Sequence, residues 1–142
     1  MSLIVKTITR LTVGLILLFG IYLLLHGHLT PGGGFAGGVI IALSLVHVML
    51  AFGKDKAFEV LSVSGAKALE GIGALLFLAV ALLGLAWGAF FLNFVPKGEV
   101  FELFSAGTIP VSNIAIACKV GAGLFSIFVA LVIMKHEPTE KE

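Results

Sequence analysis

Four long apolar runs constrain the fold of this chain more than any other feature of its sequence. They cover residues 11–28, 35–53, 71–92 and 113–134. A helix rises about 1.5 Å per residue, so each run is long enough to cross most of a hydrocarbon core about 30 Å thick. The sequence therefore predicts an all-α integral membrane protein with four transmembrane helices, forming a single membrane domain over residues 1–142.

The charged residues lie almost entirely between these runs. Of the 9 Lys and Arg and 8 Asp and Glu residues, only Lys119 falls inside a run, because a charge at the bilayer centre costs several kcal/mol. The N-terminal arm, the loop of residues 54–68 and the C-terminal tail carry Lys and Arg, whereas the other two loops carry only Lys97. Cytoplasmic loops are enriched in these residues. We therefore predict that both termini are cytoplasmic and that the chain is a multi-pass protein of the cell membrane.

The loop between the first two runs reads HGHLTPGGGFAGG, residues 26–38. Residues 32–37 match the G-x-G-x-x-G pattern of dinucleotide sites, but that site needs a preceding strand and a βαβ unit. Here both flanks are membrane spans, so we predict no nucleotide site. Instead, Pro31 is expected to end the first helix, and glycines with positive φ to form a narrow hairpin. Its overlapping GxxxG pairs, and a further pair at Gly84 and Gly88, predict close packing of helices and contacts with other subunits.

Three ionisable residues are candidates for an ion path. Lys119 is either a working group or a structurally paired lysine. Glu70 is expected at the start of the third helix, where it either interacts with the helix dipole and Lys67 or takes part in ion transfer. His47 either forms a proton relay with Glu70 or is an ordinary hydrogen-bonded histidine. Glu70 and Lys119 are expected to lie roughly 10 to 15 Å apart along the helices and not to meet.

Catalytic and metal-binding patterns are missing from the sequence. His26 and His28 point to different sides of a helix and have no third ligand, so no metal site is predicted. No Ser/His/Asp set, paired cysteines or carboxylate dyad occurs, and no basic cluster suggests nucleic acid. The single Cys118 is interpreted as a small apolar helix residue. We therefore predict no catalysis by this chain alone, no cofactor and no nucleic-acid partner.

The two longer loops carry weaker signals. The loop of residues 54–68 is short and mixed, which predicts a segment lying in the membrane interface. In the loop of residues 94–112, Phe101, Leu103 and Phe104 alternate with glutamates, which predicts a short interfacial helix or turn.

Two segments carry a family resemblance. The hairpin HGHLTPGGGFAGGVI and the segment NIAIACKVGAGLF of the last run resemble the MrpB (MnhB) subunit family of multisubunit sodium/proton antiporters, from about Ile8 to Met134. The residues that match the family pattern are Gly27, His28, Pro31, Gly32, Gly33, Gly34, Phe35, Gly37 and Gly38 in the hairpin, and Asn113, Lys119 and Gly121 in the last run.

The resemblance implies a small subunit assembled beside large antiporter-like subunits in the lipid bilayer. The host would be either a free-standing antiporter or the related module of ferredoxin-driven archaeal hydrogenase and sulfur-reducing complexes. The residues themselves leave two alternatives open, a stand-alone homo-oligomeric carrier and a purely structural scaffold subunit.

Overall fold

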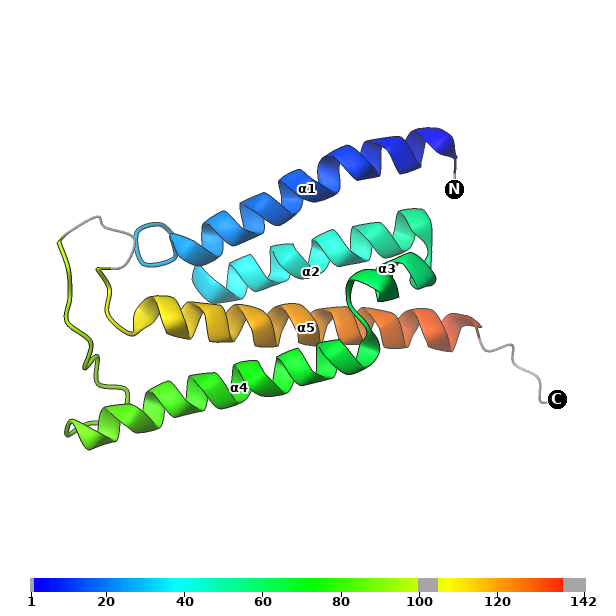
Figure 1. Cartoon of the computed structure of the whole chain (residues 1–142). Coiled ribbons are helices and arrows are strands. Elements are labelled where there is room, and N and C mark those ends of the chain that lie inside the picture. The colour runs from blue at the N-terminus through cyan, green and yellow to red at the C-terminus, as the bar shows by residue number, and fades with distance from the viewer. Residues whose placement is uncertain (1, 100–104, 137–142) are drawn as a thin grey trace.

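The computed structural model describes residues 2–99 and 105–136. Its helices are α1 (Leu3–Leu25), α2 (Gly33–Phe52), α3 (Lys54–Val60), α4 (Val63–Ala86) and α5 (Ile109–His136). The four long helices lie side by side in the order α1, α2, α5, α4, and the short α3 lies at one end (Figure 1). The described residues form no β-strand, so the prediction of an all-α chain is confirmed.

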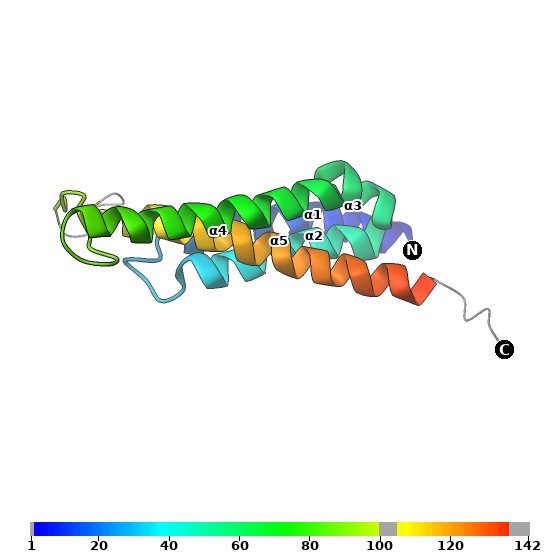
Figure 2. The ribbon, with the colours of Figure 1, turned by 90° about the horizontal axis from the view of Figure 1, so that it is seen from below.

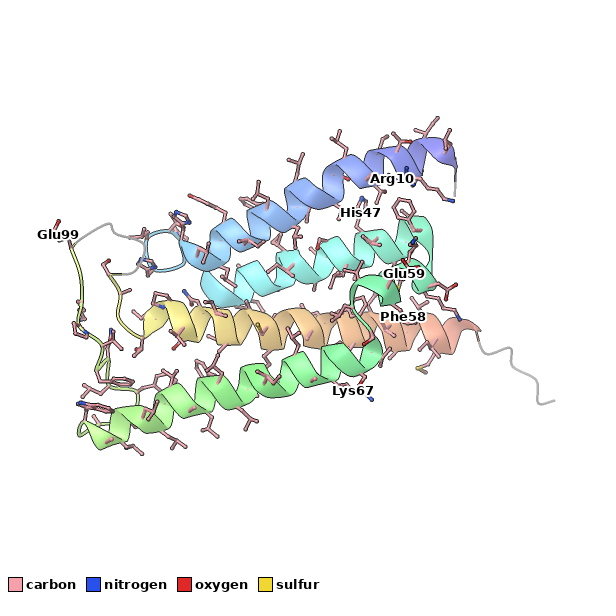
Figure 3. The ribbon with its side chains drawn as sticks, viewed as in Figure 1. Arg10, His47, Phe58, Glu59, Lys67 and Glu99 are labelled. Carbon is pink, nitrogen blue, oxygen red and sulfur yellow. The ribbon has the colours of Figure 1, made fainter. Side chains whose placement is uncertain are left out.

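All four long helices have the length and hydropathy of membrane spans, and the chain is a multi-pass membrane protein. The start of α1, the end of α5 and α3 lie at one end of the bundle, and the glycine turn lies at the other (Figure 1). Seen from below, α4 and α5 lie in front of α1 and α2 (Figure 2). Arg10, Glu59 and Lys67 lie toward the α3 end and Glu99 at the opposite end, so these charges lie toward the ends of the bundle (Figure 3).

The helices begin earlier than the apolar runs do. The Ser2 hydroxyl accepts a hydrogen bond from the Val5 N–H at 3.4 Å, so α1 begins at Leu3 and contains Lys6 and Arg10. The Ser62 hydroxyl likewise accepts from the Gly65 N–H at 3.0 Å and starts α4 at Val63. Serine caps satisfy free amide groups wherever a helix starts, whereas hydropathy marks only the part of the helix that lies in hydrocarbon. Helix and span therefore have different bounds.

The end of α4 differs from the predicted glycine pair. The helix ends at Ala86, and Gly88 lies in the following turn with φ of +112°. A Cβ on Gly84 would lie 2.6 Å from the Leu92 nitrogen and 2.9 Å from the Ala89 oxygen. Gly84 therefore makes room for the chain that folds back after α4. The sequence pattern predicted that Gly84 and Gly88 pair along one helix face, and that prediction is wrong because Gly88 lies outside α4.

A cluster of buried apolar residues lies at the α3 end of the bundle. Its members come from α2, α3, α4 and α5, and they are Met49, Ala57, Ala66, Ala122, Phe125 and Val129. Phe125 is the largest of the fully buried side chains. Large apolar side chains are exposed on all four long helices, as expected for surfaces that face lipid or other membrane subunits. Of the two loops considered from sequence, residues 54–68 form α3 and the start of α4, and Phe101, Leu103 and Phe104 lie outside the described residues.

Candidate functional site

The glycine turn joins α1 to α2. Helix α1 already ends at Leu25, where the His26 N–H donates to the Tyr22 oxygen. Pro31 therefore lies within the turn, after the helix has ended, and does not end it. Gly32 and Gly33 have φ of +145° and +79°. Residues with a Cβ rarely adopt these values, so the chain can enter α2 in this way only with glycine at both positions.

The turn is packed directly against the start of α5. The Gly34 N–H donates to Asn113 Oδ1 at 3.3 Å, and a Cβ on Gly34 would lie 2.3 Å from the Asn113 backbone oxygen. A Cβ on Gly27 would lie 2.2 Å from the Gly33 Cα and 2.8 Å from Asn113 Nδ2. Three segments of backbone therefore meet around the Asn113 side chain. This arrangement unites the hairpin residues with one residue of the last-helix motif.

The adjacent glycines Gly37 and Gly38 make close contacts on opposite faces of α2. A Cβ on Gly37 would lie 2.9 Å from the Gly20 oxygen of α1. A Cβ on Gly38 would lie 2.9 Å from the Ala117 oxygen of α5, and one on Gly121 would lie 3.2 Å from the Gly38 oxygen. Close backbone approach of this kind is what small residues permit between membrane helices. The glycines therefore hold α2 between α1 and α5.

Three hairpin residues, Phe35, His28 and Pro31, are less buried than these glycines. Phe35 is 64% exposed although it lies among buried glycines. His28 is half-buried in the turn, and Pro31 is exposed. An exposed phenylalanine at the end of a membrane helix faces lipid or another subunit, so it belongs to the outer surface of the chain.

The two charged candidates of the spans, Glu70 and Lys119, lie on the seam between α4 and α5. A Cβ on Gly73 would lie 2.8 Å from the Lys119 backbone nitrogen and 3.2 Å from its Cβ, and a Cβ on Gly123 would lie 3.6 Å from Glu70 Oε1. Each charged residue therefore lies against a glycine of the facing helix. Lys119 is exposed at the chain surface, whereas Glu70 is half-buried.

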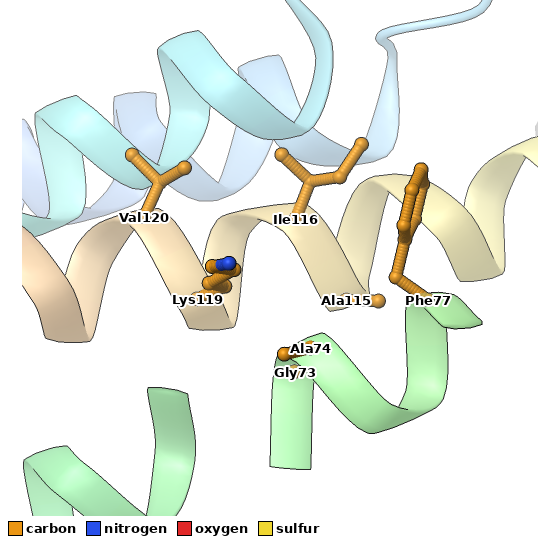
Figure 4. A pocket seen from close by; sticks show the side chains of 7 residues that line it. All are labelled: Gly73, Ala74, Phe77, Ala115, Ile116, Lys119 and Val120. Carbon is orange, nitrogen blue, oxygen red and sulfur yellow. The ribbon is translucent and has the colours of Figure 1, made fainter. Parts of the chain in front are cut away.

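A cavity of about 230 Å³ opens on this seam beside Lys119. Gly73, Ala74 and Phe77 of α4 line one side of it, and Ala115, Ile116, Lys119 and Val120 of α5 line the other (Figure 4). Among the described residues that line it, Lys119 is the only charged one. The cavity therefore gives the ammonium group an open, mostly apolar surrounding near the middle of α5.

The structure corrects the expected separation of Glu70 and Lys119. Glu70 lies two turns inside α4 and not at its start, so it does not have the predicted position at a helix N-terminus. Since Glu70 faces Gly123 and Lys119 faces Gly73, the two differ in depth by about one helical turn, roughly 5 Å. In the described part of the chain they form no ion pair within 4 Å.

His47 lies on a different interface. Its Nε2 is 3.3 Å from the Thr12 hydroxyl of α1, so the ring faces α1. Glu70 faces α5 on the other side of the bundle. The structure therefore does not bring His47 and Glu70 together, and a His–Glu relay is not assembled within this chain.

One polar cluster was missed by the sequence analysis. Asn93 Nδ2 donates to the Ala106 oxygen at 2.9 Å, and the Thr108 N–H donates to Asn93 Oδ1 at 2.9 Å. A Cβ on Gly107, whose φ is +66°, would lie 2.1 Å from Asn93 Oδ1. The sequence has an asparagine after the third run and a glycine before the fourth. This pattern fits a connection whose two ends are joined by hydrogen bonds from the asparagine side chain to the backbone. This cluster ties the first part of the connection after α4 to the residues that directly precede α5.

The family follows from a comparison with known proteins. A family model described as a domain related to the MnhB subunit of the Na⁺/H⁺ antiporter matches residues 4–126. The chain belongs to the MnhB family. The match includes the glycine turn, Glu70 and Lys119, so all the site residues described above lie within the family domain.

Individual relatives include proteins of archaea and bacteria. An uncharacterised protein of Methanocaldococcus jannaschii is 38% identical over 117 residues, covering 78% of this chain and 44% of that protein. A Staphylococcus aureus protein provisionally named antiporter subunit mnhB2 is 33% identical over 113 residues, covering 80% of this chain and 78% of that protein.

A solved structure shares both sequence and fold with this MnhB-family chain. It is the membrane-bound sulfane sulfur reductase, an archaeal respiratory membrane complex, one chain of which matches with 36% identity and a TM-score of 0.69. The match covers 89% of this chain and 56% of that one. The chain thus spans about half the length of two of these relatives and most of the length of the third.

Proposed function

We propose that this MnhB-family chain is a small membrane subunit of a multisubunit cation/proton antiporter module in the cell membrane. The observation that carries the proposal is the solved chain of 36% identity and TM-score 0.69, which belongs to a respiratory membrane complex. The match to the MnhB domain supports the same role. The chain then works beside larger antiporter-like subunits and is not an enzyme on its own.

The outer surface of the bundle supports an assembled state. Lys119 is exposed on the α4–α5 seam near the middle of a membrane span, and the described residues contain no carboxylate within 4 Å of it. An ammonium group facing hydrocarbon without a partner is costly. A neighbouring subunit that presents a carboxylate at this depth removes that cost, and the open cavity beside Lys119 leaves space for it.

The polar groups of the spans lie at two separate places. Lys119 and Glu70 lie between α4 and α5, whereas His47 lies between α1 and α2, with α5 and α2 separating the two places. We infer that Lys119 and Glu70 contribute to one polar path for cations or protons, and that His47 contributes at a separate place. The hairpin glycines and Asn113 act by packing, which fixes the helices that carry these groups.

The host assembly is either a free-standing antiporter or a redox-driven complex. The matched chain of the sulfane sulfur reductase favours the second host. In that case we expect electron transfer to take place on other subunits of the complex.

Purification in mild detergent tests the proposal. We expect a tagged chain to bring down several different membrane subunits, to be identified by mass, including a large antiporter-like one. An iron–sulfur or nickel–iron subunit among them would establish a redox-driven host, and its absence a free-standing antiporter. Recovery of copies of this chain alone would contradict the proposal and favour a homo-oligomeric carrier.

A further inference from the structure

A second cavity lies at the α3 end of the bundle, away from the charged seam. Its volume is about 360 Å³, and it opens between α1, α2 and α3. Its lining residues are Arg10 of α1, Val48 and Phe52 of α2, and Lys56, Glu59 and Val60 of α3. The positive-inside rule predicts that this end of the bundle lies at the cytoplasmic surface of the membrane.

The charges around this cavity are not balanced. The Lys56 ammonium is bonded to the Glu59 carboxylate at 2.5 Å, and both side chains are more than half exposed. Arg10 has no ion-pair partner among the described residues. Its guanidinium carbon lies 5.6 Å from the centre of the Phe52 ring. A positive charge is therefore held in a defined place above an apolar floor.

We propose that this cavity binds the phosphate headgroup of an anionic phospholipid from the cytoplasmic leaflet. The planar guanidinium of Arg10 can donate two parallel hydrogen bonds to a phosphate. The cation–π contact with Phe52 favours a guanidinium position over the ring before the lipid binds. The exposed Lys56 ammonium can exchange its contact with Glu59 for one with the same phosphate. Val48, Phe52 and Val60 then contact the glycerol and the upper acyl chain.

The position of the cavity favours a lipid over a soluble anion. Arg10 belongs to a helix that spans the membrane, and Lys6 lies one turn before it on the same helix. Basic groups between helices at the cytoplasmic surface are a recurring site for anionic lipid headgroups. The apolar floor gives a lipid additional contact area that inorganic phosphate cannot use.

Native mass spectrometry of the purified membrane assembly tests the proposal, because it counts bound lipids directly. Phosphatidylglycerol and phosphatidylcholine with identical acyl chains are added in turn, and inorganic phosphate separately. We expect phosphatidylglycerol to be retained on the subunit and phosphatidylcholine not. Equal retention of the two lipids would overturn the proposal, and so would displacement of phosphatidylglycerol by millimolar inorganic phosphate, which would indicate a soluble-anion site.

Variants locate the binding on the cavity. Arg10→Gln and Lys56→Gln should each weaken phosphatidylglycerol binding roughly five-fold, and Arg10→Lys less. Lys67→Gln is the matched control, since Lys67 is exposed at the same end of the bundle but does not line the cavity. An equal loss in the control, or no loss in Arg10→Gln, would overturn the assignment. If a variant does not assemble, a photoreactive phosphatidylglycerol is cross-linked to the wild-type protein instead. Labelling within residues 48–60 would support the proposal, and labelling found only outside that segment would overturn it. None of these measurements depends on transport, so their outcome tests lipid binding separately from the antiporter role.

Discussion

Replacing Gly34 by alanine should separate α2 from α5. The added Cβ would lie 2.3 Å from the Asn113 oxygen, 2.8 Å from its Cα and 2.9 Å from its carbonyl carbon. All three are backbone atoms, so no rotamer change relieves the clash, and the helices must move apart by about 1 Å to reach an ordinary contact. Gly34 does not have a positive φ, so the penalty is steric and not conformational.

The size of the effect follows from three contributions. Overpacking of a well-packed contact costs about 1–3 kcal/mol. Loss of the bond from the Gly34 N–H to Asn113 Oδ1 costs about 1 kcal/mol. The better helix propensity of alanine returns about 0.5–1 kcal/mol. We therefore expect the free energy of unfolding to fall by about 2 kcal/mol.

The assay is titration of the purified chain from a mild detergent into a denaturing one. Trp87 is the single tryptophan, and its ring is stacked on Phe94 with centroids 4.5 Å apart, so its fluorescence should report unfolding. Gly71→Ala is the matched control, because a Cβ there would meet no atom within 4 Å. A Gly34→Ala protein as stable as wild type, or a control equally destabilised, would refute the reasoning.

The remaining predictions concern the charged seam and the topology. Gly73→Ala should also destabilise the chain by about 2 kcal/mol, because its Cβ would lie 2.7 Å from the Ala115 oxygen; in the same titration, stability equal to that of wild type would count against the packing of α4 on α5. Lys119→Ala should assemble but lose cation/proton exchange in vesicles, and Lys119→Arg should keep part of it; full activity of the alanine variant would make the lysine structural. An impermeant thiol reagent added outside cells should label Glu99→Cys and not Ile4→Cys in a chain whose own cysteine has been replaced, and the reverse labelling would contradict cytoplasmic termini.

The features predicted best from the sequence are those whose physical cause lies in neighbouring residues of the chain. The four spans could be predicted because burying a charge in hydrocarbon costs several kcal/mol wherever the charge stands. The glycine run has a local meaning too, since Gly32 and Gly33 have positive φ values that residues with a Cβ rarely adopt. The helix starts could not be read from hydropathy, because the Ser2 and Ser62 caps precede the apolar runs. Because of that error, Glu70 was predicted at the N-terminal start of α4, whereas it lies two turns inside the helix.

The partners of each residue were decided by the tertiary structure alone. Every long helix is apolar around most of its circumference, so hydropathy does not identify the face that packs inward. Close contacts of small residues make that choice, and they place α5 between α2 and α4 although α4 precedes it in the chain. This order brings Asn113 into the glycine turn and Glu70 within one turn of Lys119, and it leaves His47 against Thr12 on the other side. The sequence by itself determined that the chain lies in the membrane, and the packing of backbone against glycine determined which of its polar groups meet.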